Sequence, residues 1–178
     1  MSRTLIVGDV HGCLAELDAL LAEVAFENQD QLVLAGDLVR KGPSSNGVVR
    51  RAIELGALAV RGNHDQRALD RRHEKLDDEC WAYLEALPYY RRFDLSVEHQ
   101  GQSHTPLLVV HAGFDPSTPL DNQSPSAMMN MRSFDEGTPT SAPGNTPWAA
   151  SWPGPSLVVF GHDAVRGLFA TKVLALAA

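Results

Sequence analysis

Five apolar runs of this chain each end at a polar side chain able to bind a metal ion, and this pattern limits the folds that the chain can form. The runs read LIVGDVHG, LVLAGD, LAVRGNHD, LLVVHAG and LVVFGHD. A short apolar run that ends at a turn residue is typical of a buried strand. Because open α/β sheets bind ligands at the carboxyl ends of their strands, we expect the polar side chains to meet in one crevice.

Helical patterns separate the first three of these strands. The segment CLAELDALLAEVAF, for example, places leucines at the spacing of one helix face. Alternation of strands and helices predicts an α/β fold with a mostly parallel sheet in the first half of the chain. The expected strands are residues 4–9, 31–37 and 57–63, and the expected helices are residues 13–26, 45–55 and 77–88.

The second half of the chain is less regular. Residues 94–99 and 105–113 bracket a polar turn and are expected to form a hairpin or adjacent strands, and 156–163 is a further strand. Residues 114–155 hold most of the prolines and show no period. Such a connection either closes over a functional site or forms a mobile surface loop. The length of 178 residues suits a single domain, residues 1–178.

The composition excludes several classes of protein. A formal net charge of −7 argues against a general nucleic-acid or anionic-membrane surface, although bound metal ions would still allow a phosphate-bearing substrate. No apolar run approaches the ~18 residues of a membrane span. Because the N-terminal sequence enters a strand at once, we expect no cleavable signal peptide. With two cysteines expected to be reduced thiols, these features predict a cytoplasmic protein.

The polar residues at the strand ends are aspartates, histidines and an asparagine, without a thiolate. Such a set suits Mn²⁺, Fe or Zn²⁺, and it exceeds what one ion needs, so we expect two ions about 3.5–4 Å apart. Taken singly, each residue is more typical of a turn, a helix cap or a structural histidine. Their joint occurrence at five strand ends favours a site. The candidate metal ligands are Asp9, His11, Asp37, Asn63, His111 and His162.

The motifs GDVHG, GDLVRKG, GNHD, VVHAG and FGHD resemble those of the calcineurin-like metallophosphoesterase superfamily. GDLVRKGP, MNMRSF and FGHDAVRGL are most similar to its symmetrical diadenosine tetraphosphate hydrolase and endopolyphosphatase subgroup, which has relatives among mRNA-decapping enzymes. The resemblance implies a β-sandwich flanked by helices. It also implies two divalent metal ions and a polyphosphate or nucleoside polyphosphate substrate.

The resemblance also implies roles for the candidate ligands. Asp9 and His11 would bind the first metal ion, and Asp37 would bridge both ions. Asn63, His111 and His162 would complete the second site. A bridging water, its pKa lowered by the ions, would attack phosphorus in line.

Residues near the ligands are expected to assist the reaction. His64 would protonate the leaving oxygen as general acid, and Asp65 would either orient the His64 imidazole or cap the following helix. Arginines and one lysine are expected to hold phosphate oxygens, with a solvated surface role as the alternative for each arginine. These phosphate-binding candidates are Lys41, Arg61, Arg132 and Arg166, of which Arg61 and Arg132 are also candidate catalytic residues.

Two positions depart from related motifs. The Ser/Thr phosphoprotein phosphatases have GDYVDRG, whose later aspartate supports the catalytic histidine, whereas this chain has Arg40 there. After Leu168 the subgroup usually continues into a Gly-rich strand and turn, whereas this chain has FATKVLALAA. That segment is apolar enough to add one strand, so we expect an incomplete C-terminal edge of the sandwich.

The leading hypothesis is a dinuclear-metal hydrolase of phosphoanhydride bonds in inorganic polyphosphate or dinucleoside polyphosphates. The first alternative is a phosphoprotein phosphatase or phosphomonoesterase that uses the same metal ions, against which Arg40 counts. The second is a catalytically impaired relative that still binds metal, which the altered C-terminal sequence favours.

Overall fold

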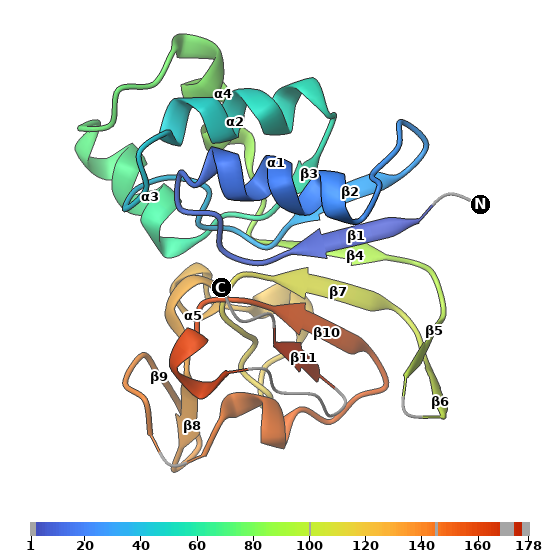
Figure 1. Ribbon diagram of the computed structural model, residues 1–178. Coiled ribbons are helices and arrows are strands. Elements are labelled where there is room, and N and C mark those ends of the chain that lie inside the picture. Colours follow the sequence, from blue (N-terminus) through green and yellow to red (C-terminus); the bar gives the residue numbers. More distant parts are fainter. Residues whose placement is uncertain (1–2, 100, 145, 168–172, 176–178) are drawn as a thin grey trace.

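Two β-sheets pack face to face, and helices cover the outer face of the first (Figure 1). The computed structural model describes residues 3–99, 101–144, 146–167 and 173–175. The first sheet is parallel, with the order β1-β2-β3. Its strands are β1 (Thr4–Val7), β2 (Gln31–Leu34) and β3 (Leu58–Ala59).

The second sheet has the order β11-β10-β7-β4. Strands β7, β10 and β11 are parallel, and β4 pairs antiparallel with β7. Every residue of β7 and β10 is buried, which is why both read as uninterrupted apolar runs, LLVV and LVVF. The strands are β4 (Tyr90–Phe93), β7 (Leu107–Val110), β10 (Leu157–Phe160) and β11 (Val173–Ala175).

A buried apolar cluster joins the two sheets. Val33 of β2 and Val60 after β3 pack with Val109 of β7 and Val159 of β10, all at 3% exposure or less. Side chains from two sheets that interdigitate in this way form the core of a sandwich. The predicted α/β sandwich is therefore confirmed.

Helices bury the opposite face of the first sheet. On α2, Val48, Val49 and Ala52 are fully buried, because residues three and four apart share one helix face. Tyr83 of α4 donates a hydrogen bond to the Ala57 carbonyl at 2.9 Å, just before β3. The helices are α1 (Leu14–Glu23), α2 (Ser45–Glu54), α3 (Asn63–Arg71) and α4 (Asp78–Ala86).

The irregular segment packs against the second sheet. Trp148 is 1% exposed, contacts Phe160 and donates its indole N–H to the Ala112 carbonyl at 3.0 Å. Phe114 belongs to the same cluster, so this segment forms a layer of the core. It contains the 3₁₀ helices η1 (Leu120–Asn122) and η2 (Trp148–Ser151), helix α5 (Pro125–Asn130), and strands β8 (Ser133–Asp135) and β9 (Thr138–Thr140).

Two expectations about strands were wrong. Residues 94–99 and 105–113 do not pair with each other: β5 (Val97–His99) pairs with β6 (Gln102–His104), and β7 pairs with β4. Strand β4 has the sequence YRRF, and because two of its four residues are arginines it has no apolar run that would predict a strand. The strand expected over 57–63 is confined to two residues, because helix α3 begins at Asn63.

The C-terminal sequence supplies the one strand that its apolar residues predict. Strand β11 pairs in parallel with β10 at the edge of the second sheet, with Val158 opposite Val173. Residues 169–172, where the departure from the related motifs begins, lie outside the described part. No helix within the described ranges is long and apolar enough to cross a membrane.

Candidate metal centre

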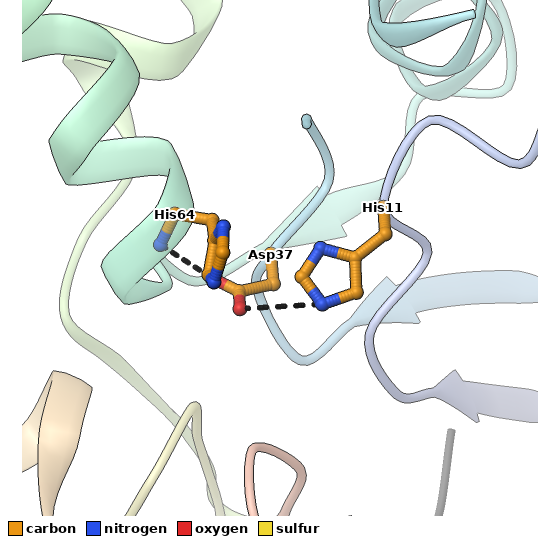
Figure 2. A group of neighbouring side chains, drawn as sticks. All are labelled: His11, Asp37 and His64. Carbon is orange, nitrogen blue, oxygen red and sulfur yellow. Dashed lines mark hydrogen bonds and ion pairs between the residues drawn. The ribbon is translucent and has the colours of Figure 1, made fainter. Parts of the chain in front are cut away.

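The polar side chains at the strand ends lie together at one edge of the sandwich. They form two groups that share Asp37, and within each group the candidate ligand atoms lie within 4.8 Å of one another. The first group is His11, Asp37 and His64, and the second is Asp37, His111 and His162. Figure 2 shows the first group, in which His11 and His64 lie on opposite sides of the Asp37 carboxylate.

Asp37 is fixed between the two groups. It is 1% exposed, and its Oδ1 accepts the backbone N–H of His64 at 2.8 Å. Its Oδ2 lies 3.4 Å from Nε2 of His111 and 3.7 Å from Nε2 of His11. Burial alone would raise the pKa of Asp37, but the charge and hydrogen bond of His111 hold it well below the usual value. One oxygen of a carboxylate therefore faces a histidine from each group, as a bridging ligand would.

The second group brings together atoms that can each offer a lone pair. Nε2 of His111 lies 3.1 Å from Nδ1 of His162 and 3.1 Å from Oδ1 of Asn63. Nδ1 of His111 donates to the Ala35 carbonyl at 2.9 Å, so neutral His111 presents a lone pair at Nε2. Lone pairs that converge in this way require a proton or a metal ion among them.

The pKa values of the two imidazoles show that this group favours one positive charge. Burial alone would lower the pKa of His111, but the Asp37 and Asp9 carboxylates raise it to about 9. Burial, together with the charge of His111, lowers the pKa of His162 to about 3. Because neutral imidazole and carboxylate oxygens are common metal ligands, a divalent ion fits this group in place of the proton.

The first group also attracts a cation. Nε2 of His11 lies 3.6 Å from Oδ2 of Asp9 and 3.7 Å from Oδ2 of Asp37. The Lys41 ammonium donates to the same His11 nitrogen at 2.7 Å. An ammonium thus lies against the lone pair that a metal ion would use, and the donor atoms suit such an ion.

The backbone around the ligands is strained and closely approached. His11, Asp37 and His162 have φ angles of 50°, 51° and 68°, a region that costs energy for residues with side chains. A Cβ on Gly62 would fall on the Asp37 carboxylate, and one on Gly161 would fall on that of Asp9. The glycines of GNHD and FGHD therefore allow a carboxylate to lie against the chain.

His64 belongs to the first group, and two roles are open to it there. Its ring centroid is 4.8 Å from that of His11, and its Nδ1 is buried without a partner in the described part of the chain. Burial, assisted by the positive charges of Lys41, His11 and Arg40, lowers the pKa of His64 to about 4. The distances suit either a ligand or a proton donor, so the acid role stays a prediction.

Asp65 makes the hydrogen bond expected of a helix cap, which is one of the two roles predicted for it. Its Oδ2 accepts the N–H of Gly62 at 2.9 Å and so caps helix α3, while its Oδ1 accepts the N–H groups of Leu38 and Val39 at 2.8 and 3.3 Å. Burial and the charge of Asp37 raise the pKa of Asp65 to about 7, and these hydrogen bonds oppose the rise. Asp65 thereby holds the loop that carries Asp37.

The guanidinium of Arg61, which was predicted to bind phosphate, makes its contacts within the protein. Its guanidinium donates to Oε1 of Gln66 at 3.0 Å and to the carbonyls of Leu84 and Glu85 at 3.3 and 2.6 Å. It also lies over the ring of Tyr89. These contacts fasten helix α4 to helix α3, and they occupy both terminal nitrogens.

Arg132 and Arg166 flank the buried Asp163, a residue that the sequence analysis did not single out. Arg166 donates to Oδ2 of Asp163 at 2.8 Å, to Oγ of Ser133 at 2.9 Å and to the Gly144 carbonyl at 2.6 Å. Nε of Arg132 lies 3.7 Å from Oδ1 of Asp163. Arg166 thus ties the 3₁₀ helix η3 (Ala164–Arg166) to the irregular segment, while Nη1 of Arg132 donates to the Ser141 carbonyl at 3.1 Å.

Comparison with known proteins agrees with this geometry. Residues 2–168 match the family model described as calcineurin-like phosphoesterase. The chain belongs to this family. Family membership implies that the site binds divalent metal ions. The six candidate ligands fit them, and the role of each ligand stays a prediction.

Two similar curated proteins carry the same description. The symmetrical bis(5'-nucleosyl)-tetraphosphatase of Serratia proteamaculans is 39% identical over 132 residues, which are 66% of this chain and 45% of that protein. The enzyme of the same description from Pectobacterium carotovorum is 37% identical over 145 residues, 74% of this chain and 49% of that protein. The chain therefore spans about half the length of these relatives.

Solved structures of the family support the fold. A structure described as that of a proposed diadenosine tetraphosphatase superimposes with a TM-score of 0.85 at 38% identity, over 97% of this chain and 81% of that one. A metallophosphoesterase from Sphaerobacter thermophilus gives a TM-score of 0.57 at 22% identity, over 92% of this chain and 62% of that one. The first of these shares both fold and sequence with this chain, and the second shares the fold.

Proposed function

We propose that this protein is a metal-dependent hydrolase that cleaves phosphoanhydride bonds in dinucleoside polyphosphates. The observation that carries the proposal is Asp37, whose single oxygen Oδ2 faces a histidine of each ligand group. The descriptions of the similar proteins name a substrate of this class. A pair of ligand groups that share one carboxylate suits two ions, for which we propose Mn²⁺, Zn²⁺ or Fe.

In this proposal, Asp9 and His11 would hold one ion, His111, His162 and Asn63 would hold the other, and Asp37 would serve both. Bound ions supply charge neutralisation for phosphate oxygens and activation of water.

The protein's own side chains would do the rest. His64 would donate a proton to the leaving oxygen. Burial and nearby positive charges lower its pKa, and an anionic substrate beside the imidazole would raise it again. Lys41 moves from His11 to a phosphate oxygen when metal replaces it, and Arg132 supplies a guanidinium from the irregular segment.

Inorganic polyphosphate contains the same bond and is the second substrate of this proposal. One assay separates the substrates: metal-free protein is supplied with Mn²⁺, Zn²⁺ or a chelator and then offered diadenosine tetraphosphate or long-chain polyphosphate. We expect metal-dependent formation of two ADP molecules per dinucleotide, as the word "symmetrical" in the relatives' description implies.

Two controls make the result decisive. The variant Asp37→Asn, which keeps the shape of the side chain, should be inactive in the same preparation. A phosphopeptide substrate tests the phosphatase alternative. Release of orthophosphate from the peptide with no cleavage of either anhydride would refute the proposal, as would folded, metal-loaded protein without any activity.

A further inference from the structure

Arg40 holds a partly buried guanidinium without a partner at the rim of the metal centre. Its Nε and Nη1 atoms are shielded from solvent, and neither makes a hydrogen bond in the described part of the chain. Its backbone is fixed, because the N–H of Arg40 donates to Oγ of Ser45 at 3.0 Å, and that hydroxyl donates to Glu74 at 3.0 Å. The loop is therefore ordered while the guanidinium it carries is unsatisfied.

An unpaired buried guanidinium destabilises a folded protein. On burial its N–H groups lose their hydrogen bonds to water, and no protein acceptor replaces them. The backbone adds to this cost. Arg40 and Lys41 have consecutive φ angles of 75° and 65°, which residues with side chains rarely adopt. Features of this kind cluster at ligand-binding sites, where the ligand supplies the missing partner.

The position of Arg40 indicates which ligand atoms it would meet. Arg40 follows the Asp37 loop, and its charge acts on the neighbouring His64 imidazole. Lys41, the next residue, reaches His11 on the other side of the first ligand group. If His64 protonates the leaving oxygen, Arg40 lies on the side from which the leaving group departs.

Two other arginines near the site have their partners within the protein. Arg61 is fastened to Gln66 and to carbonyls of helix α4, and Arg166 is fastened to Asp163 and Ser133. By contrast, Nε and Nη1 of Arg40 have no partner in the described part of the chain, so a turn of this side chain toward a substrate would break no hydrogen bond of theirs.

We propose that Arg40 binds the phosphate of the leaving group and so selects phosphoanhydride substrates over phosphomonoesters. This assignment rests on the proposed function. In a phosphoanhydride, the leaving group carries a phosphate directly beyond the bond that breaks. In a phosphomonoester, an alcohol or phenol occupies that position and offers no anionic oxygens. A planar guanidinium pairs with two phosphate oxygens at once, which a lysine cannot do.

The test compares Arg40→Met and Arg40→Lys with Arg71→Met, a control that removes an exposed arginine of helix α3. With metal-loaded protein, Arg40→Met should lower kcat/KM for diadenosine tetraphosphate by about 10- to 100-fold, the range for a charged hydrogen bond. It should change kcat/KM for p-nitrophenyl phosphate by about twofold at most. Arg40→Lys should fall between wild type and Arg40→Met, and Arg71→Met should match wild type. Equal losses on both substrates would overturn the assignment.

Two further measurements separate substrate binding from a structural role. Because the guanidinium is unsatisfied, Arg40→Met should melt at the same temperature as substrate-free wild type or higher. It should also bind a methylene-bridged diadenosine tetraphosphate analogue about 10-fold more weakly in calorimetry. A lower melting temperature with unchanged analogue affinity would overturn the proposal. Wild-type protein that binds the analogue but does not hydrolyse diadenosine tetraphosphate would refute the proposed function, while the analogue affinities would still decide the role of Arg40.

Discussion

The two ligand groups of the metal centre are held in different ways. His11, Asp37 and His64 of the first group all follow strands of the first sheet. The second group adds His111 and His162, which follow β7 and β10 of the second sheet. The first group can therefore form within one sheet, whereas the second exists only when the two sheets pack against each other.

The two groups also differ in their access to solvent. The His111 side chain is fully buried, and the His11 side chain is 14% exposed and lies beside the flexible stem of Lys41. Burial of His111 and Asp37 suits a brace between the sheets. The more open first group, which includes His64 and has Lys41 and Arg40 beside it, suits the entry of an anionic substrate. Substitutions in the two groups should therefore have different consequences.

Asp37→Asn should have the largest effect because it removes the carboxylate that both groups share. We expect kcat/KM to fall by about 10³-fold or more, since bound ions contribute several kcal/mol to the stabilisation of transition-state charge. Calorimetric titration with Mn²⁺ should show that both binding events are weakened. If this variant binds two ions with wild-type affinity, Asp37 does not link the groups.

His64→Ala should separate the two roles that the first group allows for this histidine. As a general acid, His64 contributes about 10²- to 10³-fold to kcat without holding metal. The variant should therefore lose that activity while its metal content, measured by mass spectrometry, equals that of wild type. Loss of one ion per chain would instead make His64 a ligand.

The sequence predicted the meeting of the strand ends well, because that meeting depends on local patterns. A short apolar run followed by a glycine and a polar residue is visible without any knowledge of distant contacts, and parallel strands bring their ends to one edge. The position of Asp37 between two histidine groups follows from this arrangement.

Features that depend on distant partners escaped prediction. Arg61 and Arg166 carry the charge that phosphate binding needs, but their partners are carbonyls and carboxylates that only the packed chain brings near. Helix α3 begins with NHDQR, whose polar residues resemble a turn. Arg40 was noted only as a departure from a motif, because nothing in a sequence reports an unsatisfied guanidinium.

Asp65→Asn should have a smaller effect, confined at first to the loop that carries Asp37. An amide would direct its NH₂ group toward a backbone N–H that now donates to the carboxylate. We expect metal affinity to fall by about 10- to 100-fold, the range for groups that orient metal ligands. The free energy of unfolding should fall by about 1–3 kcal/mol in urea denaturation.

Asp70→Asn is the matched control for this change. Asp70 lies exposed on the same helix and accepts a hydrogen bond from Gln66, which an asparagine can still accept. Equal effects of the two substitutions would show that the loss arises from helix α3 as a whole rather than from the Asp37 loop.

The stability of the metal-free protein should depend on pH, and this dependence originates mainly in the second group. The pKa of His162 is lowered from 6.5 to about 3, so the unfolded chain binds a proton there that the folded chain refuses. Stability is then lost as pH falls below 6.5, with a slope of at most about 1.4 kcal/mol per pH unit for this group. His111, whose pKa is raised to about 9, contributes stability that is lost as pH rises from 6.5 to 9.

Urea denaturation in the presence of a chelator measures both changes. The substitution His162→Asn should reduce the loss of stability at acid pH, and His111→Asn should reduce the loss at alkaline pH. Excess Mn²⁺ should abolish the loss of stability at alkaline pH, because the ion would replace the proton between the two imidazoles. If stability is still lost at alkaline pH with metal bound, the ion lies elsewhere.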